Sequence, residues 1–256
     1  GDEVEPRDEL GADGGEPTRQ PAGRTAARDV GDVDTVLLAV HLDEALEAMG
    51  ISVEGKIAIA RYGRSFRGIK AQLAEEHGAV GLIMYSDPMD DGYFRGDVYP
   101  KGPWRHPTGA QRGSVMNGVG DPTTPGWAST EDAPRIEPGS VEGTGIPVIP
   151  TIPISASVAE PILRSLDGAN LPNQGWQGAL PFRYHVGPGP TRVRLRVEDD
   201  RETKPHKEIW NTLAWIRGSE RPDEWIIIGA HRDSWGAGAA DNASGTASVL
   251  AAARAI

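Results

Sequence analysis

Hydrophobic positions divide the chain into a polar N-terminal segment and a longer part with strand and helix periodicities. Residues 1–34 are rich in Asp, Glu, Gly, Pro and Arg and contain few large apolar side chains. Such a segment cannot bury enough surface to offset the entropy of ordering. We therefore expect residues 1–34 to be disordered, or to be an aberrant segment foreign to the rest of the chain. The apolar spacing in residues 36–49 then predicts a short amphipathic helix.

A strand, a helix and a second strand follow between residues 56 and 86. Residues 56–62 alternate apolar and polar side chains, as a strand does. Residues 69–77 have helical periodicity that ends at Gly78, and residues 80–86 are typical of a buried strand. This order predicts a βαβ unit whose two strands are parallel.

A long loop and three shorter elements complete the first part of the chain. Residues 87–144 are dense in Gly, Pro, Trp and Tyr without a sustained period, and a loop of this length in a compact domain is more often functional than idle. Residues 146–154 carry three prolines, which favours an edge or irregular strand. Ser155 or Ser157 then caps a helix. Residues 192–197 alternate charged and apolar side chains, as a half-exposed strand would.

A second domain begins near residue 207. Residues 209–218 and 224–231 predict two strands joined by a polar turn, and the WIII run in the second favours a central strand covered on both faces. Residues 246–256 are strongly helical by propensity. This helix has neither a cap nor a partner layer, so we expect the chain to end inside a domain.

Composition and charge exclude several classes of function. The 256 residues include 26 Lys and Arg against 37 Asp and Glu, a formal net charge of −11, which is the wrong sign for binding nucleic acid or an anionic membrane. No apolar run approaches the roughly 18–20 residues that span a bilayer. The chain has no cysteine, so any metal ion must be bound by His, Asp and Glu.

One group of side chains has the composition of a metal site. His231 directly follows an apolar run, Asp233 comes two residues later, and Asp241 stands at a turn that opens a helix. The C-terminal edge of a sheet is where open α/β folds place their sites. Zinc suits imidazole nitrogen and carboxylate oxygen, and Asp233 could hold the other ring N–H. The His-x-Asp pattern alone is weak evidence, because a histidine bonded to a neighbouring aspartate is a common structural feature.

Longer motifs carry a resemblance to a known family. The string HRDSWGAGAADNASG, which begins at His231, and the blocks GKIAIARYGRSFR, HGAVGLIMYSDP, QRGSV, GDPTTPG and YHVGPGP occur in order. Together they resemble the zinc metallopeptidases of the glutamate carboxypeptidase II and transferrin receptor family over residues 31–256. The resemblance implies an α/β chain. A protease-associated domain, β-rich with a βαβ unit, occupies residues 35–206, and the truncated start of a zinc-peptidase α/β domain occupies residues 207–256.

The family's metal chemistry transfers to three positions. The resemblance implies two zinc ions (Zn²⁺), with His231 binding one and Asp241 bridging both. Asp233 orients the histidine and is the catalytic residue that this chain would contribute. The general-base glutamate and the remaining ligands would follow residue 256. The resemblance therefore implies a fragment of a dinuclear zinc exopeptidase that is inactive in isolation.

Substrate and calcium contacts are implied at four further positions. Arg67 matches an arginine that pairs with the free C-terminal carboxylate of a peptide substrate, a bidentate contact suited to guanidinium. Ser114 stands where the family has an asparagine that contacts the same carboxylate, so a strictly glutamate-selective pocket is not expected. Thr124 and Trp127 match positions that supply oxygen ligands to a structural calcium ion (Ca²⁺).

Two alternatives stay open beside the carboxypeptidase. One is a non-catalytic, receptor-like protein that uses the protease-associated domain for protein contacts. The other is an aminopeptidase, which would need an acidic anchor for the substrate amine rather than Arg67. The resemblance further implies a peptide as partner and an extracellular or periplasmic location, and it leaves homodimerisation of the whole protein open. No nucleic acid and no membrane span are expected.

Overall fold

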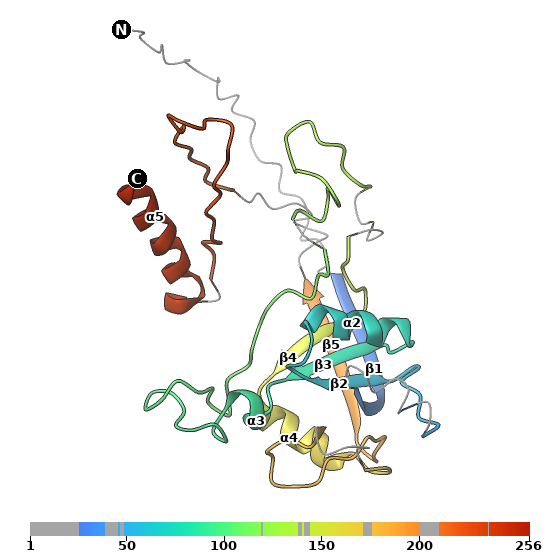
Figure 1. The fold of residues 1–256 in the computed structure, drawn as a ribbon. Helices are drawn as coiled ribbons and strands as arrows, with labels where there is room; N and C mark the ends of the chain where they lie inside the picture. Colours follow the sequence, from blue (N-terminus) through green and yellow to red (C-terminus); the bar gives the residue numbers. More distant parts are fainter. Residues whose placement is uncertain are drawn as a thin grey trace, which may run out of the picture.

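The computed structural model contains a five-stranded sheet with helices on both faces (Figure 1). It describes residues 26–38, 46, 49–118, 120–137, 140, 144–170, 176–199, 210–234 and 236–256. The strands are β1 (Ala26–Leu38), β2 (Ile57–Arg61), β3 (Gly81–Tyr85), β4 (Thr151–Ile154) and β5 (Arg192–Asp199). The helices are α2 (Arg67–Glu76), α3 (Pro88–Asp91), α4 (Ala156–Ser165) and α5 (Gly245–Ala255). The segment η2 (Ala239–Ser244) is kinked, with non-helical backbone angles at Asp241 and Asn242.

The predicted βαβ unit is confirmed. Strands β2 and β3 pair in parallel, from Ile57 opposite Gly81 to Arg61 opposite Tyr85, and α2 connects them. Strand order is β4-β3-β2-β1-β5, so the proline-containing β4 is an edge strand, as its sequence predicted. Three neighbouring pairs of strands are parallel, and only β1 with β5 is antiparallel.

Strand β1 corrects the predicted N-terminal boundary. Residues 26–34, expected to be disordered, lie in β1, which pairs with β2 on one side and with β5 on the other. Residues 36–38 continue this strand and do not begin a helix. The strand is stabilised by its two ladders and by Val30 and Val33, which pack against the core beside α4. The average composition of the segment concealed this alternation of valine with polar residues. Residues 1–25 lie outside the described part of the chain.

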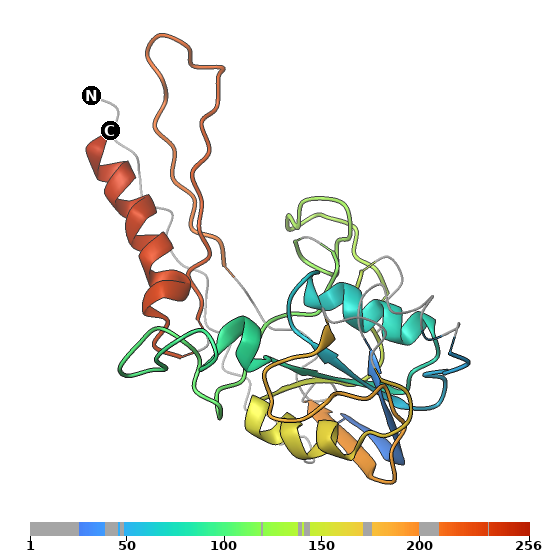
Figure 2. The same ribbon diagram turned by 60° about the horizontal axis from the view of Figure 1, so that its bottom comes forward.

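Small side chains let α2 approach one face of the sheet. Ala58 and Ala60 of β2 are fully buried there and belong to one hydrophobic cluster with Ala71 and Ala74 of α2. Alanine side chains keep little volume between helix and strand, so the two backbones approach closely. Figure 2 shows α2 and α4 on opposite sides of the sheet.

Larger side chains fill the other face. Ile57 and Ile59, which alternate with the two alanines along β2, pack with Leu163 of α4 in a second cluster. Ser155 precedes helix α4 and caps it, because its Oγ accepts the N–H of Val158 at 3.3 Å, so the predicted cap is confirmed. Both faces of the central strands are therefore covered, which explains their nearly continuous apolar sequence.

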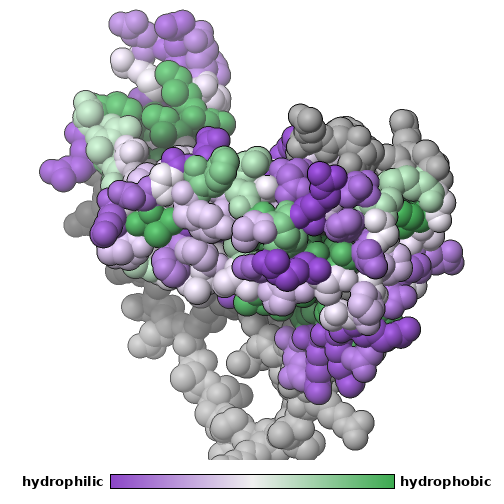
Figure 3. All heavy atoms as spheres, turned by 90° about the horizontal axis from the view of Figure 1, so that it is seen from below, coloured by the Kyte–Doolittle hydropathy of each residue, from purple (hydrophilic) through white to green (hydrophobic). Residues whose placement is uncertain are grey.

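The C-terminal segment differs from its prediction. Residues 210–230 contain no strand, and the WIII run is exposed, with Trp225 at 80% and Ile226 at 92% of full exposure. A central strand needs a paired neighbour on each side, and within the described residues this run has none. The predicted helix is confirmed as α5, which buries none of its residues. Figure 3 shows one group of hydrophobic residues at the upper left and further ones across the centre and right of the view, among hydrophilic residues.

No helix in the described part of the chain combines the length and apolar character needed to cross a membrane. The domain boundary predicted between residues 206 and 207 falls in a segment that the structure does not describe.

Removing the side chain of Leu163 should destabilise the domain. Leu163 is 1% exposed, so Leu163→Ala leaves a cavity beneath α4 and is expected to lower the free energy of unfolding by about 2–5 kcal/mol. The matched control is Val158→Ala on the same helix, where the side chain is 53% exposed and the change should stay within about 0.5 kcal/mol. Urea unfolding followed by circular dichroism measures both. Equal losses would show that α4 does not cover the sheet as described.

Candidate functional site

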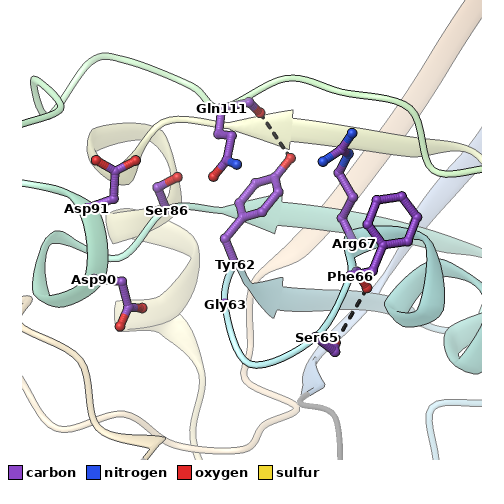
Figure 4. Close-up of a pocket in the computed structure, with 9 residues that line it drawn as sticks. All are labelled: Tyr62, Gly63, Ser65, Phe66, Arg67, Ser86, Asp90, Asp91 and Gln111. Atoms are coloured by element: carbon purple, nitrogen blue, oxygen red, sulfur yellow. Dashed lines mark hydrogen bonds between the residues drawn. The ribbon is translucent and has the colours of Figure 1, made fainter. Parts of the chain in front are cut away.

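Predicted site residues lie in three places, one of which is the turn of Thr124 and Trp127. His231, Asp233 and Asp241 form a group that we call the histidine cluster. Arg67 lies at the first turn of α2 and lines a hollow that we call the arginine pocket. Its lining residues are Tyr62, Gly63, Ser65, Phe66, Arg67, Ser86, Asp90, Asp91 and Gln111 (Figure 4).

The histidine cluster has the geometry of an oriented imidazole. Nδ1 of His231 lies 2.9 Å from Oδ1 of Asp233, and Nε2 lies 3.1 Å from Oδ1 of Asp241. A neutral imidazole donates from one nitrogen and accepts at the other. When the imidazole is protonated, Asp241 accepts the hydrogen on Nε2, and Asp233 accepts the hydrogen on Nδ1. This hydrogen bond raises the pKa of His231 and lowers the pKa of Asp233.

Asn242 and the first turn of α5 hold the backbone of His231. The carbonyl oxygen of His231 accepts hydrogen bonds from Asn242 Nδ2 at 2.6 Å and from Thr246 Oγ1 at 3.2 Å. Gly238 adopts a φ of 57°, and a Cβ there would overlap the side chain of Ser234. The tight turn that brings Asp241 back to the histidine thus requires glycine at this position.

This donor set fits zinc. An imidazole nitrogen and a carboxylate oxygen that face each other are ligands that zinc prefers, and a hydrogen bond on the other ring nitrogen is typical of metal-bound histidine. Because Asp233 raises the pKa of His231, a proton competes with the metal ion for Nε2. Within the described residues no group of three or more His, Cys, Asp or Glu side chains is placed to hold a metal ion. The cluster therefore offers two ligands.

Arg67 lies between the Phe66 ring and the loop at Gly113. Its guanidinium carbon lies 4.9 Å from the centre of the Phe66 ring. A Cβ built on Gly113 would lie within 2.6 Å of the guanidinium group, so a side chain there would displace the guanidinium from its present position. Ser114 follows this glycine, is exposed, and accepts the N–H of Met116 at 3.1 Å. The structure thus brings the loop of Ser114 to Arg67.

One nitrogen of Arg67 is unpaired. Nε of Arg67 is buried and has no hydrogen-bond partner among the described residues. A buried donor without a partner carries its full desolvation penalty. An anionic oxygen in the pocket would remove that penalty.

Sequence reasoning missed the remaining polar residues of the arginine pocket. The hydroxyl of Tyr62 donates to the carbonyl oxygen of Gln111 at 3.0 Å. Ser86 is buried, and Asp91 accepts a hydrogen bond from Arg105 at 2.6 Å. Ser86 directly follows the buried strand β3, at the C-terminal edge of the sheet. The rule that directed attention to His231 would have found it.

Lys70 connects α2 to the turn that leads into the helix. Its side chain is buried, and Nζ donates to the carbonyl oxygen of Gly63 at 2.9 Å. Gly63 and Arg64 both have positive φ, at 100° and 65°. Burial, with the nearby Arg64 and Arg61 adding to it, lowers the pKa of Lys70 to about 8.

The two residues expected to bind calcium lie in one turn. Thr124 is buried, and its carbonyl oxygen accepts the N–H of Trp127 at 3.3 Å. Asp121 holds the turn by accepting from Thr123 N at 2.8 Å and from Ser129 Oγ at 2.7 Å. These hydrogen bonds lower the pKa of Asp121. A calcium ion at Thr124 and Trp127 stays a prediction.

Two family models match the chain. The model of the PA domain, the protease-associated domain, matches residues 14–162, and the model of Peptidase family M28 matches residues 211–256. The PA-domain match begins at residue 14, inside the segment 1–34 that was expected to be disordered or foreign to the family. Together with strand β1, this match assigns part of that segment to the PA domain.

Relatives fall into all three of the predicted classes. A glutamate carboxypeptidase 2 homolog from Caenorhabditis briggsae is 39% identical over 222 residues, which are 82% of this chain and 28% of that protein. Aminopeptidase NAALADL1 from Rattus norvegicus is 39% identical over 217 residues, which are 80% of this chain and 28% of that protein. Transferrin receptor protein 2 from Mus musculus is 40% identical over 206 residues, which are 80% of this chain and 24% of that protein. The chain thus spans less than a third of each relative.

Replacing Lys70 should change how stability depends on pH. The pKa of Lys70 falls from 10.5 to about 8 on folding, so between these values the unfolded chain binds more protons. The free energy of unfolding of the wild type should therefore rise from pH 8 to 10.5 relative to Lys70→Met, and the difference should be constant below pH 8. Lys101→Met, at an exposed position, controls for the loss of one positive charge. Urea unfolding across this pH range measures the difference, and parallel curves for Lys70→Met and wild type would contradict it.

Proposed function

Because this chain belongs to the PA-domain family and carries a Peptidase family M28 segment after that domain, we propose that it is part of a zinc exopeptidase that cleaves peptides with a free C-terminal carboxylate. The observation that carries this proposal is the unpaired Arg67. Arg67 lines an open pocket, its Nε is buried, and the loop at Gly113 lies against its guanidinium group. A peptide carboxylate would accept two parallel hydrogen bonds from this guanidinium.

His231 and Asp241 are the residues that would hold zinc. When bound, zinc supplies Lewis acidity toward the scissile carbonyl and lowers the pKa of a water molecule. Asp233 keeps the proton of the imidazole on Nδ1, so that Nε2 is free to act as a ligand. These residues supply an orienting carboxylate and two ligands, and the general base would come from elsewhere in the enzyme.

Two observations favour the carboxypeptidase over its alternatives. A receptor that binds no metal has no need of an imidazole held between two carboxylates, as His231 is here. An aminopeptidase needs an acidic anchor, whereas the carboxylates in the arginine pocket, Asp90 and Asp91, are already paired with Arg61 and Arg105. The resemblance that supports this proposal also supports calcium at Thr124 and an extracellular or periplasmic location.

Arg67→Ala in the whole enzyme should weaken selectively the use of free-acid peptides. Loss of the guanidinium leaves a desolvated carboxylate partly unpaired, at a cost of about 2–5 kcal/mol in kcat/KM, while the C-terminally amidated peptide should change little. Arg67→Lys should recover only part of the lost kcat/KM for free-acid peptides, since an ammonium group cannot form the two parallel hydrogen bonds. Arg112→Ala, an exposed arginine one residue before Gly113, is the matched control. Equal losses on both peptides would show that Arg67 only holds the loop.

The 256-residue chain alone should not hydrolyse N-acetylated dipeptides, and its zinc affinity should be weak. Two side-chain ligands leave the other positions of a four-coordinate site to water. Competition with a chromogenic chelator measures zinc affinity, which His231→Ala should lower further. Turnover by the wild-type chain that disappears in His231→Ala would refute the expected inactivity.

A further inference from the structure

Lys70 brings a charge into the interior of the domain beside the arginine pocket. The residue is 2% exposed, and its Nζ donates to the carbonyl oxygen of Gly63 at 2.9 Å. Removing an ammonium group from water costs free energy, and this burial is the main reason why the pKa of Lys70 lies at about 8. The side chain is nevertheless charged at neutral pH. A buried charge that lowers stability is a candidate for a functional role.

The hydrogen bond from Lys70 holds a turn with a strained backbone. Gly63 and Arg64 have φ values of 100° and 65°, and a positive φ costs free energy at a residue such as Arg64 that has a side chain. Such conformations persist where surrounding contacts fix them. A hydrogen bond from an ammonium group is about twice as strong as one between neutral groups, so charged Lys70 is well suited to this task. Gly63 itself lines the pocket.

The same hydrogen bond supports the start of helix α2. Phe66 is the N-cap residue, its side chain makes no capping hydrogen bond, and the first turn contains no acidic residue. Arg67 is the first residue of the helix and Lys70 follows three positions later, so the two side chains leave the same face. Lys70 therefore ties the first turn of α2 back to Gly63, and Arg67 lies inside the segment that this bond closes. Figure 4 shows that segment as the loop from Tyr62 to Arg67.

The charged groups that act on Lys70 come from three elements. They are Arg61 at the end of β2, Arg64 in the turn and Asp90 in α3. Guanidinium and carboxylate groups do not change their charge between about pH 7 and 9.5. In the pocket, burial raises the pKa of Tyr62, so its hydroxyl also stays protonated in this range. Among these groups, Lys70 is the one whose charge changes.

We propose that Lys70 is a positioning residue for Arg67, and that its charged form fixes the turn before α2 and makes carboxylate binding stronger at neutral than at alkaline pH. This inference rests on the proposed function, since Arg67 must hold the carboxylate. Loss of the proton replaces the charge-assisted bond to Gly63 by a weaker one, which loosens the turn and the arginine that follows it. Because linkage is reciprocal, a carboxylate that favours charged Lys70 must also promote proton uptake when it binds.

Binding of N-acetyl-L-alanine to the 256-residue protein, followed by isothermal titration, tests the proposal. The wild-type affinity should fall roughly five- to tenfold from about pH 7 to 9.5, since a neutral hydrogen bond is about half as strong as a charge-assisted one. Lys70→Arg should remove this pH dependence, because a guanidinium group keeps its charge. Lys70→Met should bind weakly at every pH. Lys101→Met, at an exposed position, is the control and should follow the wild type.

A second measurement needs no substitution. Titrations of the wild type near pH 8 in phosphate and in Tris, two buffers with different ionisation enthalpies, give the number of protons bound with the ligand. We expect net proton uptake in the wild type and none in Lys70→Arg. If Lys70→Met does not fold, these two proteins still decide the question.

The outcomes separate this inference from the proposed function. If Arg67→Ala abolishes binding but the wild-type affinity is constant with pH, or no proton is taken up, the carboxylate site stands and the role of Lys70 is refuted. An affinity of Lys70→Arg that falls with pH as in the wild type also refutes it, because another group then titrates. Absence of binding, or binding that survives Arg67→Ala, overturns the proposed role of Arg67 and this inference with it.

Discussion

The burial of β2 and β3 on both faces is the constraint on which the rest of the molecule depends. Alanines of β2 meet α2 on one face, and isoleucines meet α4 on the other. Because Arg61 lies opposite Tyr85, the next residues of the two strands, Tyr62 and Ser86, emerge side by side at the same edge. Tyr62 N–H continues the ladder to the carbonyl oxygen of Tyr85 at 2.8 Å. The floor of the arginine pocket is thus a direct extension of the sheet.

Helix α2 sets the position of Arg67 above that floor. The helix can lie close to the sheet because its inner residues are small, and its first turn is fixed from below by the hydrogen bond from Lys70 to Gly63. On the outer side the loop at Gly113 passes against the guanidinium group. Within the part of the chain that the structure describes, no carboxylate pairs with this arginine, so its charge is available to a ligand.

Local patterns predicted the elements that depend on local contacts. The βαβ unit, the edge strand β4 and the Ser155 cap followed from alternation, proline positions and capping chemistry, and each is present. Strand β1 was missed because its stability comes from two distant partners, which no window of sequence contains. The run at Trp225 was wrongly predicted to be a strand. Its residues have high strand propensity, but propensity alone does not provide a neighbouring strand to pair with.

The candidate site shows the same division. His231, Asp233 and Asp241 lie within eleven residues and could be recognised by spacing and resemblance. Ser86 and Asp91 reach the arginine pocket only through the pairing of β3 with β2 and through the turn after it. These two residues belong to a site only because they line the same pocket as Arg67, which lies on α2. A sequence pattern cannot show that a hydroxyl is buried without a partner.

The antiparallel pairing of β1 with β5 has a consequence for the order of folding. Ala26 lies opposite Asp199, so during synthesis at roughly 5–20 residues per second Ala26 precedes its partner by about 9–35 seconds. For that interval one side of β1 is an open edge, to which another chain could add a strand. Asp29, Asp32 and Asp34 stand along β1, and repulsion between like charges opposes pairing with a second nascent copy. Once β5 has been synthesised, Arg192 pairs with Asp34 and Arg194 pairs with Asp29. The same aspartates that disfavour pairing with a second copy of β1 therefore favour pairing with β5.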